Sequence, residues 1–319
     1  MKDKMERTVL SSDTVKAEAL RLGFSACGLA PAEPLPPVHA AEFRRWIDEG
    51  RHGEMDYLTR HAGLRQDPCR LVEDARTVVS VALNYYPDFR WPAGSYRLAR
   101  YACGRDYHDV VKAKLRQLML RLGLEEGADG RVFCDTAPVD ERYWAVRCGL
   151  GWRGRNGQLI LPGAGSYFFL GELVLLLPAD RYDGPVRGRC GSCRRCVEAC
   201  PAGALVGDGT MDARRCLSYL TIERRGPLPS GVGRQMGHCI YGCDRCAEVC
   251  PWNRFARPAT EEDFRPREAL LSMTPAAWKE LTEEDYRSLF RGSAVKRAKY
   301  EGLMRNIRAV AAEEEESSL

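Results

Sequence analysis

The sequence of 319 residues lacks any uninterrupted apolar run long enough to span a membrane. Its first ten residues, MKDKMERTVL, lack the apolar stretch of a secretory signal, which favours a cytoplasmic location and a reducing environment. The first 185 residues contain no G-x-G-x-x-G after a strand, no P-loop and no Ser-His-Asp pattern. The common nucleotide-binding and hydrolase motifs are therefore missing from the part of the chain that looks most like an enzyme domain.

The excess of positive over negative side chains is also small, since the net charge is only +4. The rest of the chain is more basic than this value suggests, because the net charge becomes +8 when the four glutamates of the tail EEEESSL (313–316) are left out. Such a balance is compatible with a polyanionic partner and equally with ordinary solubility.

The remaining composition, 45% hydrophobic, is that of a globular protein with two or three domains. The pattern over 12–21 predicts a helix, with Ser12 or Asp13 as its N-cap and Gly23 at its end. Mixed α and β structure is expected up to about residue 180, since helical patterns near 38–48, 108–122 and 139–148 alternate with short strands at 77–83, 131–134, 158–162 and 167–177.

Beyond Pro178 the sequence is rich in Gly, Pro, Arg and Cys, as expected where metal rather than a hydrophobic core organises the fold. Residues 293–313 then predict a helix with an apolar face of Val295, Ala298, Leu303, Ile307 and Val310. We therefore predict an α+β protein in three parts: a mixed α/β catalytic domain (1–185), a cysteine-rich domain (186–258) and a short helical C-terminal region (259–319).

Fourteen cysteines in a chain of this kind indicate metal rather than disulfides. The run CGSCRRCVEACP (190–201) has two-residue steps followed by Cys-Pro, the ferredoxin pattern for a [4Fe–4S] cluster. The second run, CDRCAEVCP (243–251), is one ligand short, because Ile240 stands where its first cysteine is expected. Two zinc sites are the alternative, but zinc sites rarely use a third two-residue step and a trailing Cys-Pro.

In such double runs the fourth cysteine of each run ligates the cluster of the other run. The first cluster is therefore predicted to bind Cys190, Cys193, Cys196 and Cys250, and the second to bind Cys200, Cys243, Cys246 and either Cys216 or Cys239. Spacing alone leaves that last choice open. Two adjacent clusters form an electron path, and such a path needs a terminal acceptor.

Several longer segments carry a more specific pattern: FCDTAPVDERYWAVRCGLGWRGRNGQLIL, GSYFFLGEL, DARRCLSYLTIE, YGCDRCAEVCPWNR and GSAVKRAKYEGLMRNIRAVA. Together with the double cysteine run they resemble the epoxyqueuosine reductase (QueG) family over nearly the whole chain. The resemblance implies an N-terminal domain that binds cobalamin, a ferredoxin-like domain with two [4Fe–4S] clusters, and helical repeats that help hold tRNA. Longer family members continue beyond RNIRAVAAEEEESSL, so 259–319 is expected to be a truncated helical repeat.

The family reaction converts epoxyqueuosine to queuosine at the wobble position of tRNA, with electrons passed through the clusters to cobalamin. The implied partners are tRNA and an unidentified external electron donor, and a monomer that does not bind membranes is expected. The resemblance also favours Cys216 over Cys239 as the fourth ligand of the second cluster.

Asp135, in DTAP, matches the family's proposed proton donor. We expect burial beneath the cofactor to raise the pKa of this carboxyl so that it can act as an acid. The alternative role for Asp135 is the N-cap of the helix at 139–148. His108, near another helix start, is expected to be structural.

The other implied contacts have ordinary structural alternatives, as core or surface residues. For cobalamin they are Arg60, Cys103, Asp135, Gln158, Ile160, Leu170 and Ser218. For tRNA they are Arg224, Arg225, Lys296 and Arg297, with Lys299, Arg305 and Arg308 on the same basic helix.

Two other functions remain open at this point. A related cobalamin and iron–sulfur reductase of a small molecule, similar to a reductive dehalogenase, is disfavoured because no twin-arginine signal opens the chain. A ferredoxin-type electron carrier with an accessory domain would leave the segments DTAP and GLGWRGRNG without a role.

Overall fold

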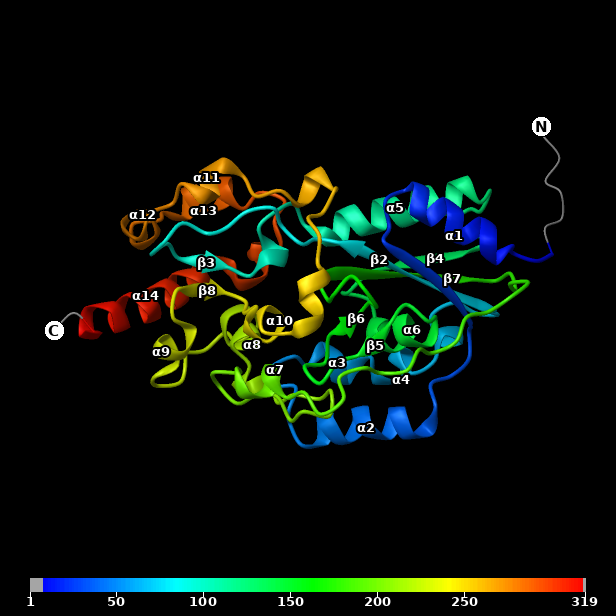
Figure 1. Ribbon diagram of the computed structural model, residues 1–319, viewed down its shortest axis with the longest axis horizontal. Helices are drawn as coiled ribbons and strands as arrows, with labels where there is room; N and C mark the ends of the chain where they lie inside the picture. Colours follow the sequence, from blue (N-terminus) through cyan, green and yellow to red (C-terminus); the bar gives the residue numbers. More distant parts are fainter. Residues whose placement is uncertain (1–7, 318–319) are drawn as a thin grey trace.

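The computed structural model describes residues 8–317. The molecule is elongated, with the N-terminal sheet and its helices at one end and the cysteine-rich and C-terminal segments at the other (Figure 1). Within residues 8–317 no helix combines the length and the apolar character needed to cross a bilayer.

The N-terminal half is built on a four-stranded antiparallel sheet with strand order β1-β2-β7-β4. Its strands are β1 (Ala26–Pro31), β2 (Thr77–Asn84), β7 (Phe168–Leu175) and β4 (Gly130–Phe133). Three of these strands were predicted, and the prediction is confirmed for them. The expected strand at 158–162 is instead the short β6 (Leu159–Ile160), which pairs with β5 (Trp152–Arg153) outside the main sheet.

Helices cover both faces of this sheet, so seven of the eight residues of β2 are buried. Val79, Val81 and Leu83 face a core shared with α1 (Ser12–Arg21) and α5 (Tyr107–Arg121). Val78 and Ala82 point the other way, into a core with α6 (Glu141–Arg147). The alternation of side chains along a strand thus produces a three-layer sandwich.

The first helix begins where the sequence predicts it, but its N-cap is Ser11 rather than Ser12 or Asp13. The Ser12 hydroxyl instead donates to the Asp180 carboxylate and ties the helix to the segment that follows the sheet. Gly23 adopts a positive φ of 89° just past the helix end, as a residue without a Cβ can do at low cost.

Apart from α2 and α14, the remaining elements are short. The link between β1 and β2 holds α2 (Pro37–Asp48), α3 (Tyr57–Arg60) and α4 (Ala62–Arg65), and β3 (Arg97–Leu98) precedes α5. The cysteine-rich segment holds α7 (Arg195–Glu198), α8 (Leu217–Ile222), α9 (Val232–Met236), β8 (Cys239–Tyr241) and α10 (Arg245–Glu248). After these come α11 (Glu268–Leu271), α12 (Pro275–Lys279), α13 (Glu283–Leu289) and α14 (Lys299–Ser317). Single 3₁₀ turns include η3 (Ala213–Arg215), η4 (Pro251–Phe255) and η6 (Ala294–Ala298).

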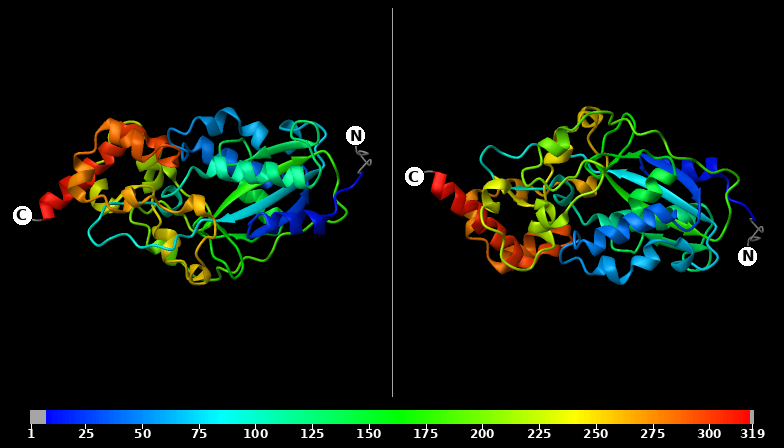
Figure 2. Two further views of the ribbon diagram at one scale, coloured as in Figure 1. Left: turned by 90° about the horizontal axis from the view of Figure 1, so that it is seen from above. Right: turned by 90° about the horizontal axis from the view of Figure 1, so that it is seen from below.

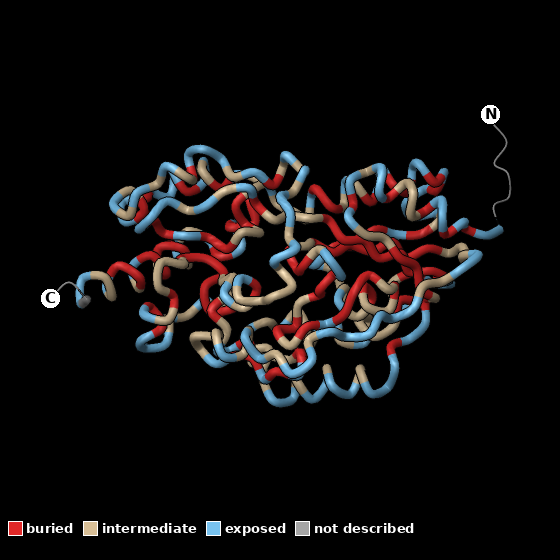
Figure 3. Tube along the Cα trace, viewed as in Figure 1, coloured by how far each residue is buried: buried red, intermediate tan, exposed pale blue. Residues whose placement is uncertain are grey.

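A third hydrophobic core joins the cysteine-rich segment to the C-terminal helices. Leu217 and Leu220 of α8 pack in it with Trp278 of α12 and with Leu303 and Ile307 of α14. All five residues of the apolar face predicted at 293–313 are buried, but the expected single helix is divided: Val295 and Ala298 lie on η6, and α14 begins at Lys299, whose φ is 61°. Figure 3 shows buried positions running from α14 into the cysteine-rich segment. The segments 186–258 and 259–319 therefore share one core.

The N-terminal half also reaches into this third core. Residues 96–103 leave the sheet, and β3 pairs in parallel with β8, so Tyr96 and Leu98 are buried against the cysteine-rich segment. This crossover places the start of α5 next to the C-terminal helices.

Two polar side chains of α14 fasten it to this core. Asn306 is fully buried and donates its two amide hydrogens to the carbonyls of Thr221 (2.8 Å) and Ile240 (2.9 Å). The guanidinium of Arg305, expected to form part of a basic outer face, donates to the backbone carbonyls of Arg224, Gly226 and Leu220. That expectation was wrong for Arg305, because its guanidinium turns inward and supplies hydrogen-bond donors to these three carbonyls.

We expect Asn306→Ala to destabilise the protein by about 2 kcal/mol or more, because two buried carbonyls lose their donors. The measurement is the midpoint of chemical denaturation followed by circular dichroism. Arg308→Ala, on the exposed face of the same helix, is the matched control and should change the stability by less than about 0.5 kcal/mol. Equal midpoints for the two variants would contradict the role given to Asn306.

Candidate active site and cluster sites

A cavity of about 970 Å³ lies where the sheet domain, the cysteine-rich segment and the C-terminal region meet. Its walls come from α3 and α4, the start of α5, the loop after β4, α8 and η6. Among the predicted site residues, the cavity brings together Arg60, Asp135, Ser218, Lys296 and Arg297.

The other predicted cobalamin contacts lie elsewhere. Cys103 is buried in the third core, and Leu170 is buried in the sheet core beside α6. Ile160 lines a separate small cavity among cysteines. The backbone N–H of Gln158 donates to Asn156 in the turn before β6, and Gln158 is not part of the large cavity's wall. Three of the seven predicted cobalamin contacts therefore face the large cavity.

Asp135 directly follows β4 and adopts a left-handed φ of 49°, which turns the chain sharply out of the sheet. Its carboxylate accepts a hydrogen bond from the Tyr107 hydroxyl and lies 3.1 Å from Nε2 of His108. The other ring nitrogen of His108 lies 2.6 Å from Oδ1 of Asp106, which is the N-cap of α5. One helix start thus aims Tyr107 and His108 at Asp135.

These contacts set the protonation of the site. Burial alone would raise the pKa of Asp135, but the hydrogen bonds from His108 and Tyr107 outweigh it, and this pKa lies below its usual range. Burial likewise opposes the charge of His108, yet its bonds to Asp106 and Asp135 raise the pKa of the imidazole to about 9. The expected rise concerns Asp135 beneath the cofactor and stays a prediction; in the chain by itself, the proton near neutral pH resides on His108 rather than on Asp135.

Glu141, the first residue of α6, completes the acidic group. Its carboxylate accepts the backbone N–H of Asp135, and burial together with the negative charge of Asp135 raises the pKa of Glu141 to about 8. The N-cap of α6 is Asp140, which accepts the N–H of Tyr143 at 3.1 Å. Asp135 is therefore not a helix cap, and its side chain remains 52% exposed to the cavity.

The sequence argument missed Tyr107, Asp106 and Glu141 and treated His108 as structural. The segment RDYHDV could have indicated them in part, because Asp106 is a typical N-cap and would place Tyr107 and His108 in the first turn of a helix. That turn meets Asp135 only because α5 packs against the sheet that ends at β4, a contact between distant parts of the chain.

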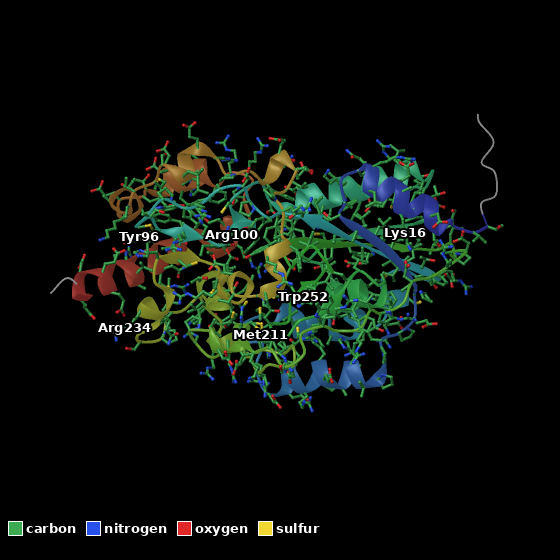
Figure 4. All side chains as sticks on the ribbon, viewed as in Figure 1. Lys16, Tyr96, Arg100, Met211, Arg234 and Trp252 are labelled. Carbon is green, nitrogen blue, oxygen red and sulfur yellow. The ribbon has the colours of Figure 1, made fainter. Side chains whose placement is uncertain are left out.

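The cysteines form two groups. Cys190, Cys193, Cys196 and Cys250 line one small cavity together with Ile160 and Trp252, so four thiols surround a common space. Figure 4 shows sulfur atoms near the labelled Trp252 and Met211. Within residues 8–317 no three His, Cys, Asp or Glu side chains are arranged to hold a single metal ion. The presence of Cys250 in the first group agrees with the crossed ligation expected of a ferredoxin-type cluster.

The second group is Cys200, Cys216, Cys243 and Cys246. Burial raises the pKa of Cys216, and the nearby Cys200 thiol raises it further. Burial also raises the pKa of Cys246, to about 12, with further contributions from the neighbouring Cys243 and Cys216. Cys239 instead points its thiol at the carbonyl of Gly242, 3.2 Å away. These neighbours support Cys216 as the fourth ligand, and Cys216 also lines the large cavity.

The pairing of two cysteine groups with a deep cavity that contains an acid–histidine pair is the arrangement of an iron–sulfur oxidoreductase. Residues 189–253 match the family model described as "4Fe-4S double cluster binding domain". Residues 65–136 match the model "Epoxyqueuosine reductase QueG, DUF1730", and this segment includes Asp106, Tyr107, His108 and Asp135.

Relatives named epoxyqueuosine reductase match most of the chain. The protein from Cellulophaga algicola is 43% identical over 93% of this chain and 96% of its own length. The protein from Escherichia coli is 39% identical over 92% of this chain and 78% of its own. The chain therefore belongs to the epoxyqueuosine reductase family.

Two solved structures of that family have the same fold. A crystal structure of epoxyqueuosine reductase with an epoxyqueuosine-modified tRNA-Tyr stem loop superposes with a TM-score of 0.85 at 26% identity, covering 96% of this chain and 82% of the other. The enzyme from Streptococcus thermophilus gives 0.84 at 30% identity, covering 93% and 80%. The predicted fold class is confirmed.

We expect Cys216→Ser to lower the iron content of the anaerobically reconstituted protein towards half, because the second cluster loses a thiolate. Iron and acid-labile sulfide per chain are the measurements. Cys239→Ser is the matched control, since its thiol donates to a backbone carbonyl, and it should retain the full iron content. The reverse outcome would assign the ligand to Cys239.

Proposed function

We propose that this protein reduces epoxyqueuosine to queuosine in tRNA, using electrons that pass through two [4Fe–4S] clusters to a cobalamin in the large cavity. The reaction removes the epoxide oxygen as water and consumes two electrons and two protons. One observation carries the proposal: the same cavity is lined by Cys216, from the second cysteine group, and by the Asp135 and His108 proton site. The tRNA substrate implies action in the cytoplasm.

The cavity suits a large flat cofactor such as cobalamin. Tyr57, Tyr101 and Tyr219 supply aromatic wall, while Arg60 and Ser218 supply donors for the amide groups at the edge of a corrin ring. Nε of Arg65 is buried and lacks a hydrogen-bond partner within the described residues, as expected of a donor reserved for a bound group. When bound, cobalamin supplies the strongly reducing cobalt chemistry that the epoxide needs.

The two cysteine groups give the electron path a direction. Cys250, of the first group, also lines an open groove on the surface, whereas Cys216, of the second group, faces the large cavity. Cys196, of the first group, lies close enough to Cys246, of the second group, to raise its pKa, so the two groups are neighbours. Electrons are proposed to enter at the first cluster and leave from the second.

The protons follow a shorter path. His108 holds a proton at Nε2 against the Asp135 carboxylate, and Asp106 fixes the ring through Nδ1. Asp135, half exposed, transfers this proton to the oxygen that leaves the substrate carbon. Covering the cavity with cofactor and nucleotide removes water from Asp135, which favours its protonated form and the transfer from His108.

The predicted tRNA contacts divide into two kinds. Arg225 donates to the carbonyls of Arg297 and Ala298 and so braces η6. Arg297 forms a bidentate ion pair with Glu223, since Nε donates to Oε1 and Nη2 donates to Oε2. Lys296 lines the cavity without an ion pair to any residue between 8 and 317 and is the side chain we propose for a phosphate. The TM-score of 0.85 to a structure that contains a modified tRNA stem loop supports this use of the cavity.

The direct test is turnover. Anaerobically reconstituted protein with added cobalamin and a chemical reductant should convert epoxyqueuosine in purified tRNA to queuosine, measured by mass spectrometry of the nucleosides. The same preparation should leave halogenated organic compounds unchanged. Dehalogenation without conversion of the tRNA would replace this proposal with a small-molecule reductase.

Asp135→Asn should reduce turnover by about 100-fold or more, because the amide cannot relay the proton. Iron content and cobalamin binding should stay at the wild-type level, since Asn keeps the shape of the side chain. Cofactor content by absorbance and turnover by nucleoside analysis check both statements. An active variant would remove Asp135 from the proposed role.

His108→Asn should alter the pH profile of turnover. Because hydrogen bonds to two carboxylates raise the pKa of His108 to about 9, its proton is present at neutral pH and is lost as the pH rises through 9. Wild-type turnover should therefore fall above about pH 9, whereas the variant should be slow at neutral pH and lack that fall. His238→Asn, beside α14, is the control and should keep the wild-type profile. A variant with an unchanged alkaline fall would show that another group titrates.

A further inference from the structure

We propose that an acidic electron-carrier protein docks on a collar of arginines around the first cluster, on the side of the molecule opposite the substrate cavity. The inference deepens the proposed function and rests on it, because it names the partner that supplies the electrons. The collar consists of Arg187, Arg189, Arg194, Arg195, Arg254 and Arg257.

These six arginines come from two segments that also carry the ligands of the first cluster. Arg187 to Arg195 flank Cys190, Cys193 and Cys196, while Arg254 and Arg257 follow Cys250. Arg195 and Arg254 line one surface groove of about 910 Å³ together with Cys250. The groove thus joins the two segments at Arg195 and Arg254, and the other four arginines belong to the collar by their place in the chain beside the cysteines.

The charge of the collar is not neutralised by the chain itself. All six arginines are exposed, and within residues 8–317 none of them forms an ion pair. Elsewhere the structure pairs many of its arginines, as in Arg297 with Glu223 and Arg100 with Glu248. Two exposed carboxylates line the groove with these arginines: Glu198 on α7, and Glu248 on α10, which is paired with Arg100. An unpaired set of this size favours an acidic partner.

The collar also encloses apolar surface. Phe255 is 37% exposed, and its ring lies beneath the guanidinium of Arg254 at 4.5 Å. Beside it, Trp252 reaches inward to the cavity of the first cysteine group and packs edge-on against Trp152. An aromatic centre within a charged rim is the usual anatomy of a protein interface. Electron transfer slows steeply with distance, so a carrier docked here would meet the cluster at its shortest approach.

The position of the collar distinguishes this partner from tRNA. Both views of Figure 2 place the yellow-orange segment near η4 and the blue helices α2 to α4 on opposite sides of the molecule. Because α3 and α4 line the substrate cavity, a tRNA bound over that cavity leaves the collar free. Donor and substrate can then bind at the same time.

The experiment measures reduction of the clusters in the full-length reconstituted protein, without tRNA. Reduced flavodoxin, an acidic flavoprotein, serves as the carrier, and titanium(III) citrate serves as a small reductant. Stopped-flow bleaching of the iron–sulfur absorbance gives the rates. The double variant Arg195→Glu with Arg254→Glu should be reduced by flavodoxin at least about tenfold more slowly at low salt, and this difference should shrink as salt increases.

Titanium(III) citrate should reduce the double variant as fast as the wild type, which shows that its clusters are intact. Arg44→Glu, an exposed arginine on α2, is the matched control and should leave the flavodoxin rate unchanged. Wild-type rates in the double variant would overturn the docking site. Weaker binding of tRNA with unchanged flavodoxin rates would assign the collar to nucleic acid instead. Clusters that titanium(III) citrate cannot reduce, even in the wild type, would overturn the proposed function itself.

Discussion

The structure depends on the crossing of cysteines between the two runs. Cys250, from the second run, lies with Cys190, Cys193 and Cys196, while Cys200 lies near Cys216. The cysteine-rich segment thus gains two internal links that join residues far apart in the sequence, in addition to the buried apolar side chains that it contributes to the third core. The hydrophobic core that surrounds the second group comes from the crossover at 96–103 and from the C-terminal helices. Neither the cysteines nor that core would be sufficient alone.

Most of the framework could be predicted from local pattern. The helix at 12–21 and the apolar positions of α14 were found from a helical period, and the strands β2, β4 and β7 were found as short β-branched or apolar runs. The strand β1 was missed because ACGLAP is rich in small residues with little β propensity. The grouping of Cys250 with the first run could also be predicted, since the chemistry of ferredoxin clusters determines it.

The active-site protonation could not be predicted in this way. Whether Asp135 gains or loses a proton depends on His108 and Tyr107, which reach it from a helix that begins 28 residues earlier. Sequence spacing shows neither this contact nor the exposure of Asp135 to the cavity. The same holds for Ile160, which a family resemblance assigned to the corrin but which lies beside the first cysteine group. The inward contacts of the Arg305 guanidinium could not be predicted from the sequence, because its partners are backbone carbonyls.

The third core has a consequence for how the protein matures. Its parts include Tyr96, the cysteine-rich segment and α14, so synthesis must reach the last helix before the core can close. The core of the sheet domain waits for later residues as well, because Phe264 is buried in it beside α5 and β7. The thiols of both cysteine runs are therefore synthesised before either core can close. Iron and sulfide can therefore reach these thiols before α14 packs against the segment that carries them.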